Sequence, residues 1–288
     1  YELVDSNGIV PIRLSEKEYV RAHDFRRYLH KNLEDFIIET PLENPLDFLN
    51  KQFDASLIKD VQTKWLPYDF RNQNIDDFLE NLNIDKTVEI SSIQGGYSNA
   101  IKQLNKFIAV GYQDYAKYRS DPSKEASSQL SPYFHSGQIS THEVFEKISE
   151  LEEWSPELID PKMVGRREGW WGSSENFESF MDELITWREL GYHTCVRRAN
   201  YNQYSSLPEW AIKTLHEHSS DEREYIYSLD ELTYSQTHDE IWNAAQNQLR
   251  TQGVIQNYLR MLWGKKILEW TPNPQIALSY MITLNDRY

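Results

Sequence analysis

The chain has 288 residues, of which 39% are hydrophobic and 13% aromatic, so it can bury a sizeable core. Its formal net charge of −15 argues against non-specific nucleic-acid binding over the whole surface, although a local basic face is still compatible with it. No apolar run is long enough to span a membrane, and the single cysteine, Cys195, excludes a disulfide framework or a multi-cysteine metal site.

The sequence predicts a short strand-like segment at the start of the chain and helices after it. Residues 1–12 have strand-like character, with Asn7-Gly8 as a turn signal, and helical periodicity begins near Glu16 and runs to about Ile38. Two prolines mark residues 40–45 as a linker. Further helices are expected over 45–50, 54–60, 75–82, 96–109, 111–119, 140–150, 174–202, 208–218, 221–227, 238–250, 252–270 and 274–284. The sequence therefore predicts a mainly α fold, with residues 1–40 ending an α/β domain and 41–288 forming a helical domain.

The stretch from Trp242 to Trp270 holds three of the nine tryptophans. Its pattern predicts two helices broken near Gly253. Trp263 and Trp270 lie seven residues apart, or two helical turns, so they share one helix face. Three indoles so close in sequence are either core packing, which spacing alone favours, or a path for electrons.

The segment from Ser127 to Ser140 is dense in small hydroxyl side chains ahead of a helix. Hydroxyls and free backbone N–H groups at such a place suit a phosphate or a pyrophosphate. Most Ser-rich helix starts are simple caps, so this signal is weak by itself.

Several motifs together carry a family resemblance. The segment SSQLSPYFHSGQIS (127–140) resembles the Ser/Thr-Ser-x-Leu-Ser-Pro signature of DNA photolyases and cryptochromes, and FMDELITWREL (180–190) resembles the helix that faces their active site. RMLWGKKILEW (260–270) and LNDRY (284–288) are similar to class II cyclobutane-dimer photolyases. The front segment, IVPIRLSEKEYVRAHDFRRYL (9–29), looks like the junction between the family's α/β (Rossmann-like) antenna domain and its helical domain.

The resemblance implies a helical domain that holds FAD. Photoexcited reduced FAD would pass an electron to a cyclobutane pyrimidine dimer flipped out of DNA, and the dimer would split. It also implies an intracellular repair enzyme, cytoplasmic or nucleoid-associated, whose partner is DNA with pyrimidine dimers. We expect no membrane and no metal, and an antenna chromophore is possible in the full-length protein. Two alternatives stay open: a cryptochrome-like blue-light photoreceptor that binds FAD without repair, and a structural helical remnant without a cofactor.

The resemblance also implies which residues hold the cofactor. We expect FAD to be bound by Tyr115, Ser127, Ser128, Leu130, Ser131, Asn257 and Arg260, the last beside an acidic partner. Asn285 aligns with the Asn that class II enzymes place near flavin N5, and we favour it for that role over Asn257. Where class II enzymes usually carry a Met-His pair, this chain has Ile255-Gln256. The family continues beyond both ends of this sequence, so the chain is expected to be truncated.

The lesion and the electron path have candidates of their own. Glu183 and Trp187 are four residues apart on one helix, so they point the same way. The Glu183 carboxyl would hydrogen-bond a thymine carbonyl, the Trp187 indole would pack on the flipped bases, and Met261 would lie beside them. Trp263, Trp242 and Trp270 match the class II electron-transfer chain, with Trp263 nearest the flavin. Trp170-Trp171 is expected to be packing or a surface wedge rather than a second redox pair.

Overall fold

The computed structural model describes residues 5–38, 40–42, 44, 47, 55–66, 71 and 74–288. Contacts divide the chain into two compact units, residues 41–89 and the combination of residues 1–40 with 90–288. Among the described residues the regular structure is helical and no strand occurs. This confirms the mainly α fold.

The smaller unit contains two described helices, α2 (Ala55–Lys64) and α3 (Ile75–Glu80). Asn74 caps α3, because its side chain accepts a hydrogen bond from the N–H of Asp76 at 3.0 Å. The helix expected over 45–50 lies largely outside the described residues. The unit begins within the expected linker, 40–45.

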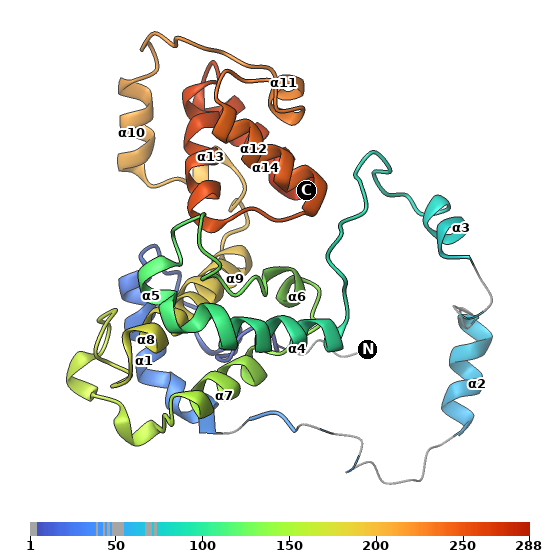
Figure 1. Cartoon of the computed structure of the whole chain (residues 1–288), viewed down its shortest axis with the longest axis vertical. Helices are drawn as coiled ribbons and strands as arrows, with labels where there is room; N and C mark the ends of the chain where they lie inside the picture. Colours follow the sequence, from blue (N-terminus) through green and yellow to red (C-terminus); the bar gives the residue numbers. More distant parts are fainter. Residues whose placement is uncertain are drawn as a thin grey trace. The chain divides into compact units, whose positions relative to one another are not determined.

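The larger unit has two hydrophobic clusters, which correspond to two groups of helices in Figure 1. The first cluster draws on α1 (Ala22–Ile38), α4 (Tyr97–Lys106), α5 (Tyr115–Tyr118), α6 (Ser131–His135), α7 (Thr141–Leu151) and α8 (Glu175–Met181). Helix α9 (Arg188–Arg197) follows α8 after a π-helical turn. The exposed α10 (Glu209–Glu217) connects this group to the next.

The second cluster is built from α11 (Leu229–Thr233), α12 (Glu240–Gln252), α13 (Asn257–Glu269) and α14 (Pro274–Arg287). Asp239 caps α12, and Gly253 ends it with a φ of 70°, a left-handed conformation that favours glycine. Gln256 then caps α13 by accepting from the N–H of Tyr258 at 2.7 Å. The predicted break near Gly253 is therefore confirmed.

Three local predictions were wrong. Residues 5–12 form no strand, while 1–4 lie outside the described residues. The helix expected from Glu16 begins only at Ala22, and the segment before it is held by a long-range contact, with His193 Nε2 3.3 Å from the backbone oxygen of Ser15. Residues 221–227 are not helical, and the helix there is α11, which begins after the Ser228 capping box.

The domain division expected at residues 40 and 41 stays a prediction. In this fold, residues 1–40 pack with 90–288 rather than standing apart. The Glu189 carboxylate accepts the N–H of Ile9 at 2.6 Å, and Arg26 of α1 is paired with Asp182. The front segment is thus integrated into the larger unit.

Candidate active site

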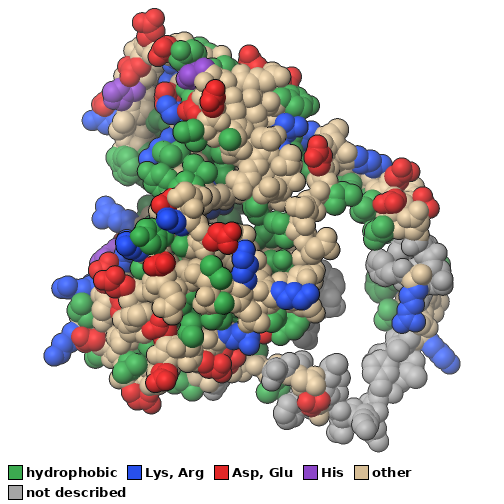
Figure 2. Space-filling view, viewed as in Figure 1, with side chains coloured by type: hydrophobic (Ala, Val, Ile, Leu, Met, Phe, Trp, Pro, Cys, Tyr) green, Lys and Arg blue, Asp and Glu red, His purple; other side chains and the backbone are tan. Residues whose placement is uncertain are grey.

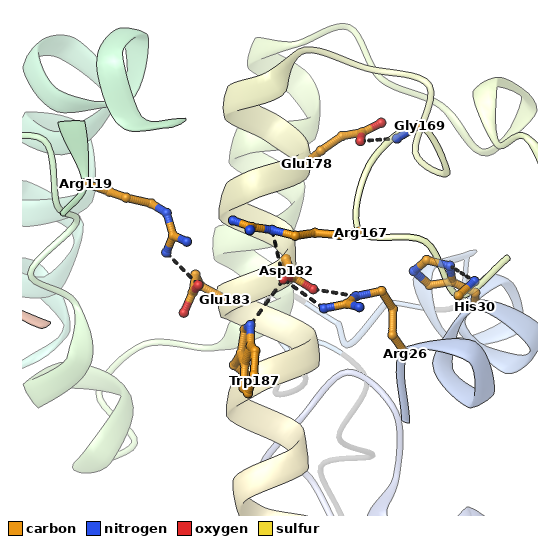
Figure 3. A network of polar contacts seen from close by, with 10 residues as sticks. Arg26, His30, Arg119, Arg167, Gly169, Glu178, Asp182, Glu183 and Trp187 are labelled. Atoms are coloured by element: carbon orange, nitrogen blue, oxygen red, sulfur yellow. Dashed lines mark hydrogen bonds and ion pairs between the residues drawn. The ribbon is translucent and has the colours of Figure 1, made fainter. Parts of the chain in front are cut away.

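A π-helical turn over Asp182–Trp187 joins α8 to α9 and carries both predicted lesion residues, Glu183 and Trp187. Such turns are rare and occur often at functional sites. In Figure 3 the neighbouring carboxylates of Asp182 and Glu183 are directed to opposite sides of the helix. Each carboxylate therefore meets a different arginine.

Glu183 is held by Arg119, which follows α5. The Arg119 Nη1 donates to Glu183 Oε1 at 2.6 Å, and the two side chains keep 19% and 31% of their surface exposed. The guanidinium also lies 5.8 Å from the centre of the Tyr115 ring. Tyr115 itself is buried against Phe107 and Phe180, and this burial raises the pKa of its hydroxyl. The Glu183 carboxylate is thus fixed in place yet still reachable from solvent.

Asp182 is buried and holds Trp187. Both of its oxygens accept from Arg26, at 2.8 and 3.1 Å, in the paired geometry that suits a guanidinium. Asp182 Oδ2 also accepts the indole N–H of Trp187 at 3.2 Å, and Arg167 lies 3.8 Å away. The Trp187 ring nevertheless remains 50% exposed. Its N–H is fixed while much of its surface is free for stacking.

Next to this network, His30 stacks on Trp170 at 3.8 Å between ring centres (Figure 3 shows His30). Burial and the nearby Arg26 lower the pKa of His30 to about 3, so the imidazole is neutral and its Nδ1 accepts the N–H of Gly165 at 3.1 Å. Trp170 and Trp171 are both buried in the first cluster. The expectation that they serve packing is confirmed.

The start of α13 reaches the same region. Gln256, which replaces the His of the class II pattern, donates from Nε2 to the backbone oxygen of Arg119 at 2.8 Å. On α13, Tyr258, Met261 and Leu262 are exposed although they are apolar. These residues are three and four positions apart, so they share one face of α13, and an exposed apolar face of this kind is available to a ligand or a partner. Met261 lies on this face, and its place beside the lesion stays a prediction.

The polar residues of α13 and α14 proposed for the flavin are exposed. Arg260 donates from Nη2 to Asn257 Oδ1 at 3.2 Å, so among the described residues its partner is an amide and not the expected carboxylate. Asn285 is exposed near the end of α14. The choice between Asn257 and Asn285 stays a prediction.

The Ser-rich segment has an unusual backbone. Gln129 adopts a φ of 54°, which is uncommon for a residue other than glycine. Ser127 and Ser128 are half-buried, Leu130 is buried, and Ser131 is exposed at the start of α6. Strained backbone of this kind is concentrated at functional sites. Its role in cofactor binding stays a prediction.

The three indoles of the second cluster come together in space. Trp242, Trp263 and Trp270 are at most 4% exposed. The rings of Trp242 and Trp270 meet edge to face, with centres 5.6 Å apart, and the Trp242 N–H donates to the backbone oxygen of Trp263 at 3.2 Å. Their proximity is established, whereas their role in electron transfer stays a prediction.

One pocket lies elsewhere in the described residues. It has a volume of about 310 Å³ and is lined by Asn202, Tyr204 and one side of α14, from Gln275 to Thr283. None of these residues belongs to the predicted site. The described residues contain no cluster that could hold a metal ion and no helix long and apolar enough to cross a membrane.

Comparison with known proteins shows the family of the chain. The chain is 34% identical over 286 residues to the deoxyribodipyrimidine photo-lyase of Methanothermobacter thermautotrophicus, covering 99% of this chain and 55% of that protein. It is 32% identical over 289 residues to the deoxyribodipyrimidine photo-lyase of Potorous tridactylus, covering 99% and 48%. The chain belongs to the photolyase and cryptochrome family. It spans about half the length of these curated relatives.

A solved structure supports the same fold. A bacterial class III photolyase from Agrobacterium tumefaciens superposes with a TM-score of 0.54 over 97% of this chain and 54% of that one, at 19% identity. No family model matches the chain. The superposition on the class III photolyase confirms the predicted photolyase fold, while the assignment to class II stays a prediction.

Sequence reasoning missed the partners of the site residues. Arg119 and Arg26 lie 64 and 156 residues from the carboxylates that they bind. Gln246 accepts the indole N–H of Trp263 and was also missed. One signal in the sequence could have predicted them. Asp182 and Glu183 are adjacent carboxylates in a helical motif, and buried carboxylates require cationic partners.

Proposed function

We propose that this protein is a light-driven DNA repair flavoprotein, a deoxyribodipyrimidine photolyase that splits cyclobutane pyrimidine dimers. The observation that carries the proposal is the match of 99% of the chain to relatives named deoxyribodipyrimidine photo-lyase. The partner would be DNA that contains pyrimidine dimers. The single cysteine fits work inside the cell, in a reducing compartment.

The cofactor would be FAD, which supplies one-electron chemistry when light excites it. The residues present fit such a group. Asn257, Arg260 and Asn285 offer exposed polar atoms, and Met261 and Leu262 offer exposed apolar surface for a ring system. Because Gln129 has a left-handed backbone conformation, the serines next to it would hold the pyrophosphate. An antenna chromophore would belong to a further part of the protein.

The lesion would lie against Glu183 and Trp187. Arg119 holds the Glu183 carboxyl group in a fixed position, from which it can engage the polar edge of a flipped base. The half-exposed Trp187 ring, anchored by Asp182, can stack on that base, and such stacking is worth roughly 1–3 kcal/mol per base. On the face that Figure 2 shows, acidic and basic side chains are interspersed, so contact with DNA would depend on local basic groups.

The proposed repair is tested by loading the purified protein with FAD, reducing the flavin, and adding an oligonucleotide with a cyclobutane dimer. Dimers should disappear under blue light and persist in the dark. Glu183→Ala should slow repair strongly, whereas Glu175→Ala, an exposed carboxylate at the start of α8, serves as the matched control. Dimers that persist under light with confirmed reduced flavin would refute repair and favour a photoreceptor. Failure to bind flavin would refute both.

A further inference from the structure

Gln246 is a completely buried amide on α12, with 0% of its surface exposed. Its Oε1 accepts the indole N–H of Trp263 at 2.8 Å, and its Nε2 faces the backbone oxygen of Thr233 at 3.4 Å. Burying an amide is costly unless both ends find partners, and here each end has one. An apolar side chain in the same space would leave the buried Trp263 N–H without an acceptor, so the amide is tied to the state of that indole.

The other internal indole of the cluster has an acceptor of the same chemical kind. The Trp242 N–H donates to the backbone oxygen of Trp263 at 3.2 Å. Both acceptors are amide oxygens, which accept hydrogen bonds but do not take up a proton near neutral pH. By contrast, the Trp270 ring lies 5.2 Å from the imidazole ring of His238.

We propose that Gln246 is a positioning residue for electron transfer, which keeps the indole proton on Trp263 while that ring is oxidised. Trp263 gives one electron to photoexcited oxidised flavin and becomes a radical cation, which still carries its N–H. One electron from Trp242 then restores neutral Trp263, and the positive charge moves on towards Trp270. No proton leaves either internal indole in these two steps. The inference rests on the proposed function, because it needs a flavin as electron acceptor.

The physical basis is the difference between an acceptor and a base. A positively charged indole donates a stronger hydrogen bond than a neutral one, so the amide oxygen stabilises the cation. A base at the same place would remove the proton and leave a neutral radical, which has lost the driving force to oxidise Trp242. The hole would then stay on Trp263. An amide at position 246 provides stabilisation without such a trap.

The hydrogen bond itself is tested without flavin. In the full chain, the indole N–H of Trp263 is assigned by NMR from a Trp263→Phe variant, and its hydrogen exchange is measured. Gln246→Met keeps the volume and removes the acceptor, so exchange should become several-fold faster and the N–H resonance should shift. An unchanged resonance and exchange rate would overturn the proposal.

The proton is then followed in flavin-loaded protein by transient absorption. A Trp242→Phe background stops the hole at Trp263, so the fate of its proton can be observed. With Gln246 present, the radical should remain cationic and its decay should be insensitive to D2O. With Gln246→Glu in alkaline buffer, the carboxylate, favoured by Arg250 one turn along α12, should produce the neutral radical several-fold faster. Gln248→Glu on the same helix is the control, and should behave as its parent.

The outcomes distinguish the role of the Gln246 amide from the electron path through the tryptophans. Equal rates of proton loss with Gln246 and with Gln246→Glu would overturn the role of the amide while leaving the electron path in place. A flavin-loaded parent that yields no tryptophan radical would overturn the electron path and this proposal with it. Return of the Gln246→Glu variant to parental behaviour in acidic buffer, where its new carboxyl is protonated, would support the proposal.

Discussion

Glu189 makes the stability of this fold depend on pH. The residue is 3% exposed, and its Oε1 accepts the N–H of Ile9 at 2.6 Å, which attaches the front segment to α9. Burial raises the pKa of this carboxyl to about 8, and the backbone hydrogen bonds from Ile9 and Val10 only partly oppose the shift. Glu189 is therefore mostly protonated at neutral pH in the folded state and ionised in the unfolded one.

The magnitude follows from the two pKa values. The pKa rises from 4.5 to about 8, and at about 1.4 kcal/mol per unit the difference is about 5 kcal/mol. Below pH 4.5 both states bind the proton, so the full stability is present. As the pH rises towards about 8 the unfolded state releases its proton first, and stability falls. Above that pH the loss is complete.

Glu189→Gln should remove this pH dependence, because the amide oxygen can still accept the N–H of Ile9 and does not titrate. The assay is urea unfolding, followed by tryptophan fluorescence, at intervals between about pH 5 and pH 9. The free energy of unfolding of the parent should fall by up to about 5 kcal/mol relative to the variant. Glu175→Gln, at an exposed position at the start of α8, is the control. Parallel curves for parent and Glu189→Gln would refute the reasoning.

Three further predictions concern other parts of the larger unit. Trp263→Phe should slow photoreduction of bound flavin, and an equal rate measured under blue light would remove Trp263 from the path. Gly253→Ala should cost about 1 kcal/mol in urea unfolding because its φ is 70°, whereas Gly264→Ala, within α13 at ordinary contact with Met281, should cost less. Arg119→Leu should leave the Glu183 carboxyl group without its ion-pair partner and slow dimer repair under blue light; an unchanged repair rate would contradict a role for this pair.

The parts of the fold that could be predicted from sequence are those fixed by local chemistry. Gly253 ends α12 because only a residue tolerant of positive φ fits there, and a glycine between helical patterns is a readable signal. The helix predicted over residues 221–227 was wrong because a contact with a distant part of the chain determines the conformation there. The Tyr227 N–H donates to the backbone oxygen of Trp270, and its ring packs on that indole at 5.6 Å. Such a contact between residues 43 apart leaves no local pattern.

The candidate site also combines features that could be predicted from sequence with features set by distant contacts. Its candidate residues, Glu183, Trp187 and the three indoles, followed from the motifs that resemble a known family, whereas spacing alone favoured core packing for the indoles. Their partners did not, because the Gln246 amide and the Arg119 guanidinium are chosen by packing between elements. Arg260 differs from these residues because its contact is local: Asn257, three residues earlier on α13, accepts from its guanidinium where an acidic residue was expected.

The two adjacent carboxylates of the π-helical turn have very different surroundings. Successive residues of any helix point in different directions, so Asp182 enters the core and meets Arg26 while Glu183 reaches the surface and meets Arg119. The buried pair can hold a charge in the core because the guanidinium satisfies both oxygens. Its remaining capacity is used to hold the Trp187 N–H. Asp182 thus fixes the orientation of an indole that solvent can reach, and Glu183 is left as the carboxylate able to engage a ligand beside it.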